Sequence, residues 1–201
     1  MITVISSVTG NFSSILNMLK KIGYSATLTD NYDEISKSKT VIFPGVGKFD
    51  NVMQYIYEKK IDRGILNCLE NNSKLLGICV GMQALFPKSE EGELSGLNLI
   101  KGKIKKFQFD NKKLRVPHMG WNKVNFCNGK FKEKLLDSRF YFVHSYFAVC
   151  DDKKDILSTT NYSIDFVSSV KKGNIYGVQF HPEKSHYFGK KFLETFIKNS
   201  E

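Results

Sequence analysis

Apolar and polar positions follow one pattern up to about residue 97 of this 201-residue chain and a different one beyond it. In the first part, short apolar runs predict buried strands at "ITVIS" (2–6), "SATLTD" (25–30), "TVIF" (40–43) and "KLLGI" (74–78). Apolar residues at helical spacing predict helices at 11–23, 51–60 and 62–72, and another helix that begins in "VGMQALF" (80–86). Strands that alternate with helices predict a parallel sheet in an α/β fold.

After residue 97 the pattern is mostly that of strands. Candidate strands are 97–109, 113–126, 139–150, 155–162, 164–173 and 174–180, and the turn "KKGN" (171–174) suits a hairpin between the last two. One helix, at about 185–199, is expected to close the chain. Because no repeat, linker or low-complexity segment interrupts the chain, we expect a single domain over residues 1–201.

Composition limits the class of protein. Hydrophobic residues make up 41% and charged residues 25%, which is typical of a soluble globular chain. No apolar run approaches the ~18 residues needed to cross a membrane. The apolar start "MITVISSVTG" has no basic region ahead of it, so a secretory signal is not expected. These features predict a cytoplasmic protein that binds no membrane.

The formal net charge of +10 suggests an anionic partner, but its pattern is not that of a nucleic-acid site. Nucleic acid, an anionic substrate and a negatively charged protein could each explain it. The lysines are dispersed in short groups such as "KIKK" (103–106) and form no long basic stripe. Solvated lysines are therefore the favoured explanation, followed by a patch that faces a partner protein, and no nucleic acid is expected.

The four cysteines form neither a CxxC pair nor a metal-ligand pattern, so no metal or other cofactor is expected. One of them, Cys79, lies in Gly77-Ile78-Cys79-Val80-Gly81, where an apolar strand meets the start of a helix. In a G-x-nucleophile-x-G turn, the flanking glycines let the backbone crowd, and the nucleophile is presented on an exposed turn. Free N–H groups at the helix start stabilise a thiolate and an oxyanion. The alternative is a buried structural cysteine between closely packed glycines.

A nucleophilic cysteine needs a base, and His181 is the best candidate among the four histidines. It follows an apolar strand in "GVQFHPEKS", and Glu183 is close enough to orient its ring. Cys79, His181 and Glu183 would then act as nucleophile, base and orienting group. The alternative for His181 is an ordinary histidine at a strand end. His118 and His144 lie in apolar stretches and are expected to be structural.

Three blocks, "PGVGKF", "GICVGMQALF" and "GVQFHPEKS", resemble the signature blocks of class I (triad) glutamine amidotransferases. "VPHMGWNKV" and "YFVHSY" more narrowly resemble the glutaminase subunits of imidazole glycerol phosphate synthases. "SSVTGNFSSILNMLKKIGY" matches that group in outline, although many members have "DYGxGN" where this chain has "SSVTGN". The resemblance implies a flavodoxin-like three-layer sandwich with a mostly parallel central sheet and an antiparallel, strand-rich C-terminal half.

The resemblance also implies a reaction. The Cys79 thiolate would attack the side-chain amide of glutamine, and His181 would protonate the leaving ammonia and then activate water. The Val80 N–H would be one oxyanion donor, and a peptide at Gly45, Val46 or Gly47 that can flip would supply the second. The implied substrate-binding residues are Gln83, His144, Ser145 and Tyr146.

The implied partner is a (β/α)₈-barrel cyclase that receives the ammonia in a heterodimer and forms imidazole glycerol phosphate. Residues that resemble the family's interface residues for this partner are Asn11, Trp121, Asn122, Tyr141 and Lys184. The alternative for Trp121 is a core aromatic. Three alternatives remain: a related subunit that feeds another synthase, such as a sugar-amidating enzyme; a catalytically silent nucleic-acid-binding module; and a stand-alone cysteine hydrolase.

Overall fold

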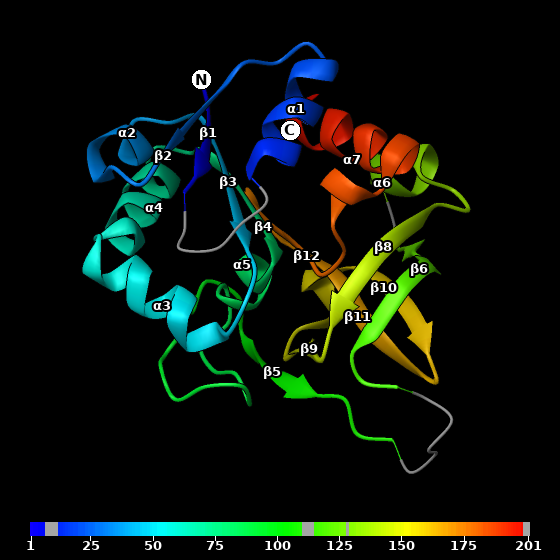
Figure 1. The fold of residues 1–201 in the computed structure, drawn as a ribbon. Helices are drawn as coiled ribbons and strands as arrows, with labels where there is room; N and C mark the ends of the chain where they lie inside the picture. The colour runs from blue at the N-terminus through cyan, green and yellow to red at the C-terminus, as the bar shows by residue number, and fades with distance from the viewer. Residues whose placement is uncertain (7–11, 110–114, 128, 199–201) are drawn as a thin grey trace.

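A computed structural model describes residues 1–6, 12–109, 115–127 and 129–198, and Figure 1 shows its ribbon. Its centre is a row of parallel strands in the order β2-β1-β3-β4-β12. Their bounds are β1 (Ile2–Ile5), β2 (Ala26–Thr29), β3 (Thr40–Gly45), β4 (Lys74–Cys79) and β12 (Ile175–Val178). β1 and β3 are buried along their whole length, which explains why both read as continuous apolar runs.

Helices cover both faces of this parallel part, so it forms the middle of three layers (Figure 1). α1 and α7 lie on one face, and α2, α3 and α4 lie on the other. Their bounds are α1 (Phe12–Lys21), α2 (Tyr32–Ser36), α3 (Phe49–Glu58), α4 (Ile61–Glu70) and α7 (His186–Lys198). Among the described residues, no helix is long and apolar enough to span a membrane.

The second part of the chain extends the sheet with antiparallel strands. β12 is followed across the sheet by β11 (Ile164–Lys172), β10 (Ile156–Tyr162) and β7 (Asn125–Phe126), while β9 (Tyr146–Cys150) pairs with β11 and with β5 (Gly102–Lys106). β6 (His118–Lys123) and β8 (Arg139–His144) form a separate antiparallel pair. The predicted α/β fold with a mostly parallel centre and an antiparallel C-terminal half is therefore confirmed.

Several element boundaries differ from the sequence-based expectation. The run 139–150 is two strands, since the chain leaves one sheet and enters the other at Ser145. The run 97–109 contains strand only at β5. The helix expected from "VGMQALF" is the short α5 (Val80–Gln83), and α6 (Gly129–Lys134) was not expected. α2 was also missed, although Asn31 accepts hydrogen bonds from the N–H groups of Asp33 and Glu34 as an N-cap does.

Candidate active site

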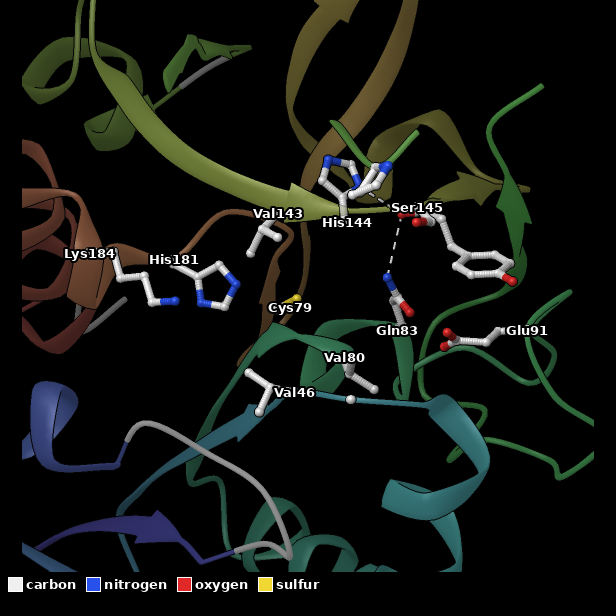
Figure 2. Close-up of a pocket in the computed structure, with 13 residues that line it drawn as sticks. Val46, Cys79, Val80, Gln83, Glu91, Val143, His144, Ser145, His181 and Lys184 are labelled. Atoms are coloured by element: carbon white, nitrogen blue, oxygen red, sulfur yellow. Dashed lines mark hydrogen bonds between the residues drawn. The ribbon is translucent and has the colours of Figure 1, made fainter. Parts of the chain in front are cut away.

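A cavity of about 490 Å³ lies beside the carboxyl ends of β3 and β4, where the parallel and antiparallel parts meet. Figure 2 shows it in close-up. It is lined by Val46, Gly47, Cys79, Val80, Gln83, Glu91, Pro117, Val143, His144, Ser145, Tyr146, His181 and Lys184. Ligands of open α/β sheets commonly bind at this edge.

The Cys79 thiol lies at a sharp turn between β4 and α5. Its backbone has φ 55° and ψ −112°, a conformation that is rare for a residue with a side chain and is held by the surroundings. A Cβ atom at Gly77 would lie 2.5 Å from the Gly81 carbonyl oxygen, so the flanking glycines are required by close packing, as predicted. The expectation of an exposed turn is wrong, because Cys79 is only 5% exposed and lies within the cavity wall.

Two glutamine side chains form a chain of hydrogen bonds that ends at the Cys79 thiol. Gln83 Nε2 donates to Gln179 Oε1 at 3.1 Å, and Gln179 Nε2 donates to Cys79 Sγ at 3.7 Å. Gln179 is fully buried, so its amide is held in place by these two contacts. A donor directed at sulfur stabilises the thiolate. Gln179 was not predicted, because its position opposite Cys79 depends on the register between β12 and β4.

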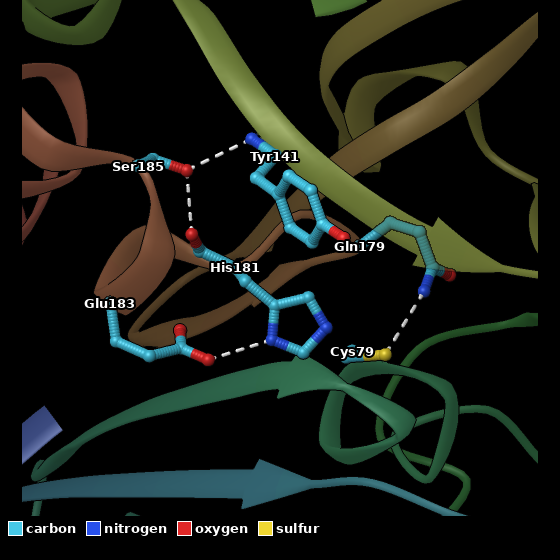
Figure 3. Close-up of polar contacts among 6 residues, drawn as sticks. All are labelled: Cys79, Tyr141, Gln179, His181, Glu183 and Ser185. Atoms are coloured by element: carbon cyan, nitrogen blue, oxygen red, sulfur yellow. Dashed lines mark hydrogen bonds and ion pairs between the residues drawn. The ribbon is translucent and has the colours of Figure 1, made fainter. Parts of the chain in front are cut away.

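His181 and Glu183 form a buried pair next to Cys79 (Figure 3). His181 Nδ1 lies 2.7 Å from Glu183 Oε1, and the two side chains are 2% and 4% exposed. The backbone of His181 is also fixed, because its N–H donates to the Tyr141 carbonyl and its carbonyl accepts from Ser185 Oγ. The other ring nitrogen, Nε2, is buried and has no hydrogen-bond partner among the described residues. It is therefore available to exchange a proton within the cavity.

The electrostatics favour a charged imidazole at this position. Burial by itself lowers the pKa of His181, but the ionised Cys79 thiolate and the Glu183 carboxylate outweigh burial and raise it to about 10. At neutral pH the charged His181 imidazolium therefore lies beside the Cys79 sulfur. That pair supplies both a nucleophile and an acid for the leaving group.

The two predicted sources of an oxyanion hole both lie beside Cys79. Val80 begins α5, and the N–H groups of a first helical turn have no acceptor within the helix. Gly45, the last residue of β3, is paired in register with Cys79. Gly47 has φ +98°, which L side chains rarely adopt, and it lines the cavity with Val46. Since α5 has only four residues, its free N–H groups matter more at this site than a helix dipole.

The opposite end of the cavity carries polar acceptors. Gln83 Nε2 donates to the Tyr146 carbonyl at 3.4 Å, while Gln83 Oε1 is buried without a partner among the described residues. The Glu91 carboxylate lies nearby (Figure 2), accepts from the Phe49 N–H at 2.9 Å, and has its pKa raised by burial. These oxygens suit an ammonium group. Glu91 was missed because it stands in the polar stretch "KSEEGE", whose pattern reveals no cavity.

Of the described residues that were predicted to face a partner, Lys184 lines the cavity, and its Nζ lies 5.7 Å from the centre of the Tyr141 ring. Trp121 is 46% exposed and stacks on His186 at 5.6 Å, so it is not a core aromatic. Asn122 is half-buried on β6. Asn11 lies outside the described residues. Within the described ranges, no group of three or more His, Cys, Asp or Glu side chains could hold a metal.

Residues 3–199 match the family described as "Glutamine amidotransferase class-I". The chain is 50% identical to "Imidazole glycerol phosphate synthase subunit HisH 2" of Methanococcus maripaludis, with all of both chains covered. It is 43% identical to "Imidazole glycerol phosphate synthase subunit HisH" of Leptospira borgpetersenii, with 98% of each covered.

Solved structures agree at the level of the fold. A crystal structure of a glutamine amidotransferase has a TM-score of 0.78 at 18% identity and covers 98% of this chain and 97% of its own. The glutaminase domain of Trypanosoma brucei CTPS with bound acivicin has a TM-score of 0.66 at 15% identity, covering 100% and 94%. This chain belongs to the class-I glutamine amidotransferases, in the branch whose curated members are named imidazole glycerol phosphate synthase subunit HisH.

Proposed function

We propose that this chain is the glutaminase subunit of an imidazole glycerol phosphate synthase, in histidine biosynthesis. The observation that carries the proposal is the buried His181, which is paired with Glu183 through one ring nitrogen and presents the other without a partner beside Cys79. The identity of 50% to a HisH relative over the full length supports the choice of branch.

The chemistry has two stages. The Cys79 thiolate attacks the side-chain amide carbon of glutamine, and the oxyanion is stabilised by the Val80 N–H and a second peptide N–H at 45–47. The tetrahedral intermediate collapses when the C–N bond breaks, and the nitrogen leaves as ammonia with the proton from His181. The resulting γ-glutamyl thioester is attacked by water, whose proton passes to His181, and glutamate and the thiolate are released.

The amino-acid end of glutamine would occupy the polar end of the cavity. Its α-ammonium group is suited to Glu91 and to the unpaired oxygen of Gln83, and its carboxylate to the backbone at 144–146. This arrangement would place the side-chain amide toward Cys79. No cofactor takes part in these steps.

The ammonia would pass to a (β/α)₈ cyclase subunit bound as a heterodimer in the cytoplasm. The exposed Trp121 and Lys184, with Tyr141 and Asn122, support a docking face beside the cavity. Asn11 is proposed for the same face. A basic chain with dispersed lysines suits an acidic partner rim, and neither nucleic acid nor a membrane is part of the proposal.

Partner docking is proposed to control the second oxyanion donor. A peptide at 45–47 can alternate between two orientations because Gly47 is free to adopt unusual backbone angles. The test measures glutamate release from the chain alone, with the cyclase, and with the cyclase and an acceptor analogue. A slow rate alone and an increase of ~10²–10³-fold with the analogue are expected. Equal rates in all three mixtures would contradict gating and favour a stand-alone hydrolase.

A second candidate is a paralogous subunit that feeds ammonia to another synthase, such as a sugar-amidating enzyme. The specific observation is the number 2 in the names of two relatives, from Methanococcus maripaludis and Pseudomonas aeruginosa. Such a chain would share the same cavity and cysteine chemistry and differ in its partner. Stimulation of the glutaminase by a histidine-pathway cyclase supports the first candidate, and stimulation only by a different synthase supports the second.

A further inference from the structure

A line of hydrogen-bonded side chains runs from β6 to the wall of the cavity. Asn122 Nδ2 lies 3.3 Å from His118 Nε2, His118 Nδ1 lies 2.9 Å from His144 Nε2, and His144 Nδ1 lies 2.7 Å from the Tyr146 carbonyl oxygen. We call Asn122, His118, His144 and the Tyr146 carbonyl the histidine bridge. The histidine bridge plays no part in the cysteine chemistry described above.

The protons of the histidine bridge can be placed by elimination. Asn122 Oδ1 accepts from the Lys123 N–H, and its Nδ2 donates to the Asn161 carbonyl, so the amide orientation is fixed. Nδ2 therefore donates to His118 Nε2, and His118 must carry its proton on Nδ1. That proton goes to His144 Nε2, so His144 carries its own proton on Nδ1. Its acceptor is the Tyr146 carbonyl, and every contact has one donor and one acceptor.

The surroundings keep both rings neutral and in place. His118 is 3% exposed and His144 is 5% exposed. The His118 ring stacks between Phe142, at a centroid distance of 4.8 Å, and Tyr162, at 4.1 Å. Burial lowers the pKa of His118 to about 4 and that of His144 to about 3. A neutral imidazole has one donor and one acceptor, which is what the histidine bridge requires.

The end of the histidine bridge fixes backbone that lines the cavity. The Tyr146 carbonyl accepts from His144 and also from Gln83, and the Ser145 carbonyl accepts from the Phe107 N–H at 3.0 Å. Both carbonyls are thus held by groups of this chain, while Ser145 and Tyr146 contribute to the cavity lining. If the His118 donor were lost, His144 could move its proton to Nε2 and leave the Tyr146 carbonyl without that donor.

We propose that His118 is a positioning residue for glutamine binding: acting through His144, it sets the Tyr146 carbonyl and hence the backbone wall at 144–146. The inference rests on the proposed function, because it assumes that this wall receives the amino-acid end of glutamine. It predicts an effect on KM and little effect on kcat, since the histidine bridge does not contact Cys79, His181 or Glu183.

The test compares three variants in the complex with the synthase partner. His118→Phe keeps a stacked ring but removes both nitrogens, and KM for glutamine should rise about 10- to 100-fold with kcat within threefold. His118→Asn places Nδ2 where His118 has Nδ1, so it can still donate to His144, and KM should return to within about threefold of wild type. Tyr162→Phe keeps the stack and loses only a hydroxyl that donates to the Arg115 carbonyl, so KM should not change.

A second measurement remains informative even if His118→Phe fails to fold. In ¹⁵N-histidine-labelled wild-type protein, a scalar coupling across the N–H···N bond should join His118 Nδ1 to His144 Nε2. A proton on His118 Nε2, or a wild-type KM in His118→Phe, would overturn the inference. If the wild type shows no partner-stimulated glutaminase, the proposed function fails instead, while the coupling still reports whether the histidine bridge exists.

Discussion

Two groups of buried histidines lie around the same cavity and are in opposite electrostatic states. His181 is 1% exposed, and its pKa is raised to about 10, whereas His118 and His144 are 3% and 5% exposed and have pKa values lowered to about 4 and about 3. Burial disfavours the charged ring at all three positions. The difference arises from the partners. The Cys79 sulfur and the Glu183 carboxylate raise the pKa of His181, whereas His118 and His144 hydrogen-bond to neutral groups and the charge of His181 further lowers the pKa of His144.

This contrast shows how one residue type can serve two purposes in one cavity. A charged partner suits His181 to the proposed role of proton carrier, and neutral hydrogen-bond partners suit His118 and His144 to fixed connections with one proton each. The expectation that His118 and His144 are structural is consistent with their burial. The hydrogen bonds of the histidine bridge also connect the two rings in one donor-to-acceptor order, from Asn122 to the Tyr146 carbonyl.

The largest effect is expected at the charged group. Replacing His181 with Asn removes the proton carrier, and Cys79→Ala removes the nucleophile, so either change should lower the glutaminase kcat by about 10⁴-fold or more. The measurement is glutamate release by the complex. With free ammonium salt in place of glutamine, the Cys79→Ala complex should still form product, because the synthase step does not need the thiol. Residual glutaminase within tenfold of wild type would contradict both assignments.

A smaller loss is expected from Gly47→Val, which changes the oxyanion hole and leaves both histidine groups intact. A β-branched residue is strained at φ +98°, so the peptide at 45–47 should lose its freedom to turn. Stimulated kcat should fall ~10²–10³-fold, the usual cost of one oxyanion donor. Complex formation, measured by calorimetry, should change far less. Equal losses of binding and activity would instead indicate that the change disrupts the docking face.

Glu183→Gln makes the surroundings of His181 resemble those of His144. Without the carboxylate, the pKa of His181 should fall, and less imidazolium should be present at neutral pH. A loss of about 10²-fold in kcat is expected, because Glu183 orients and charges the ring but transfers no proton. The ¹⁵N shifts of His181, followed with pH, measure the fall directly. An unchanged titration would mean that Glu183 does not set the charge of the ring.

The smallest effect concerns stability against pH. The pKa of His118 is about 4 in the folded state and ~6.5 in the unfolded state, so between these pH values the unfolded state binds the proton more tightly. The free energy of unfolding is therefore greatest above pH ~6.5 and decreases as the pH falls toward 4. His118→Asn removes one such group. Between pH 6.5 and 4.5, its free energy of unfolding should fall less steeply than that of wild type, by up to about 1.4 kcal/mol per pH unit. Urea unfolding across this range tests it, and parallel curves would contradict a neutral His118.

Local sequence patterns predicted the parallel half and the grouping of Cys79, His181 and Glu183, for a shared physical reason. Strands buried on both faces appear as continuous apolar runs. The glycines two positions before and after Cys79 indicate a tight turn. Glu183 lies two residues from His181, so their pairing needs no long-range information. The structure brings these residues together as expected, and their catalytic roles stay predictions.

Features that depend on long-range packing could not be read in this way. The break at Ser145 occurs because its two flanking strands pair with different sheets, which no periodicity reveals. Gln179, Glu91 and His118 reach the cavity or its wall through contacts between residues far apart in the chain. The burial of Cys79 likewise comes from elements around the turn, so an exposed thiol was the wrong expectation.

The parallel register of β4 and β12 has a consequence for insertions and deletions. Val178 lies opposite Ile78, so the chain leaves both strands at the same level, close to Cys79 on one side and His181 on the other. Successive strand residues rise by ~3.3 Å and face opposite sides. Losing one residue inside β12 would shift His181 by one step and reverse the face of the segment that leads to it. A length change at 173–174, in the hairpin between β11 and β12, need not alter the register of β12 with β4. We therefore expect insertions and deletions to be tolerated in this hairpin and not inside β12.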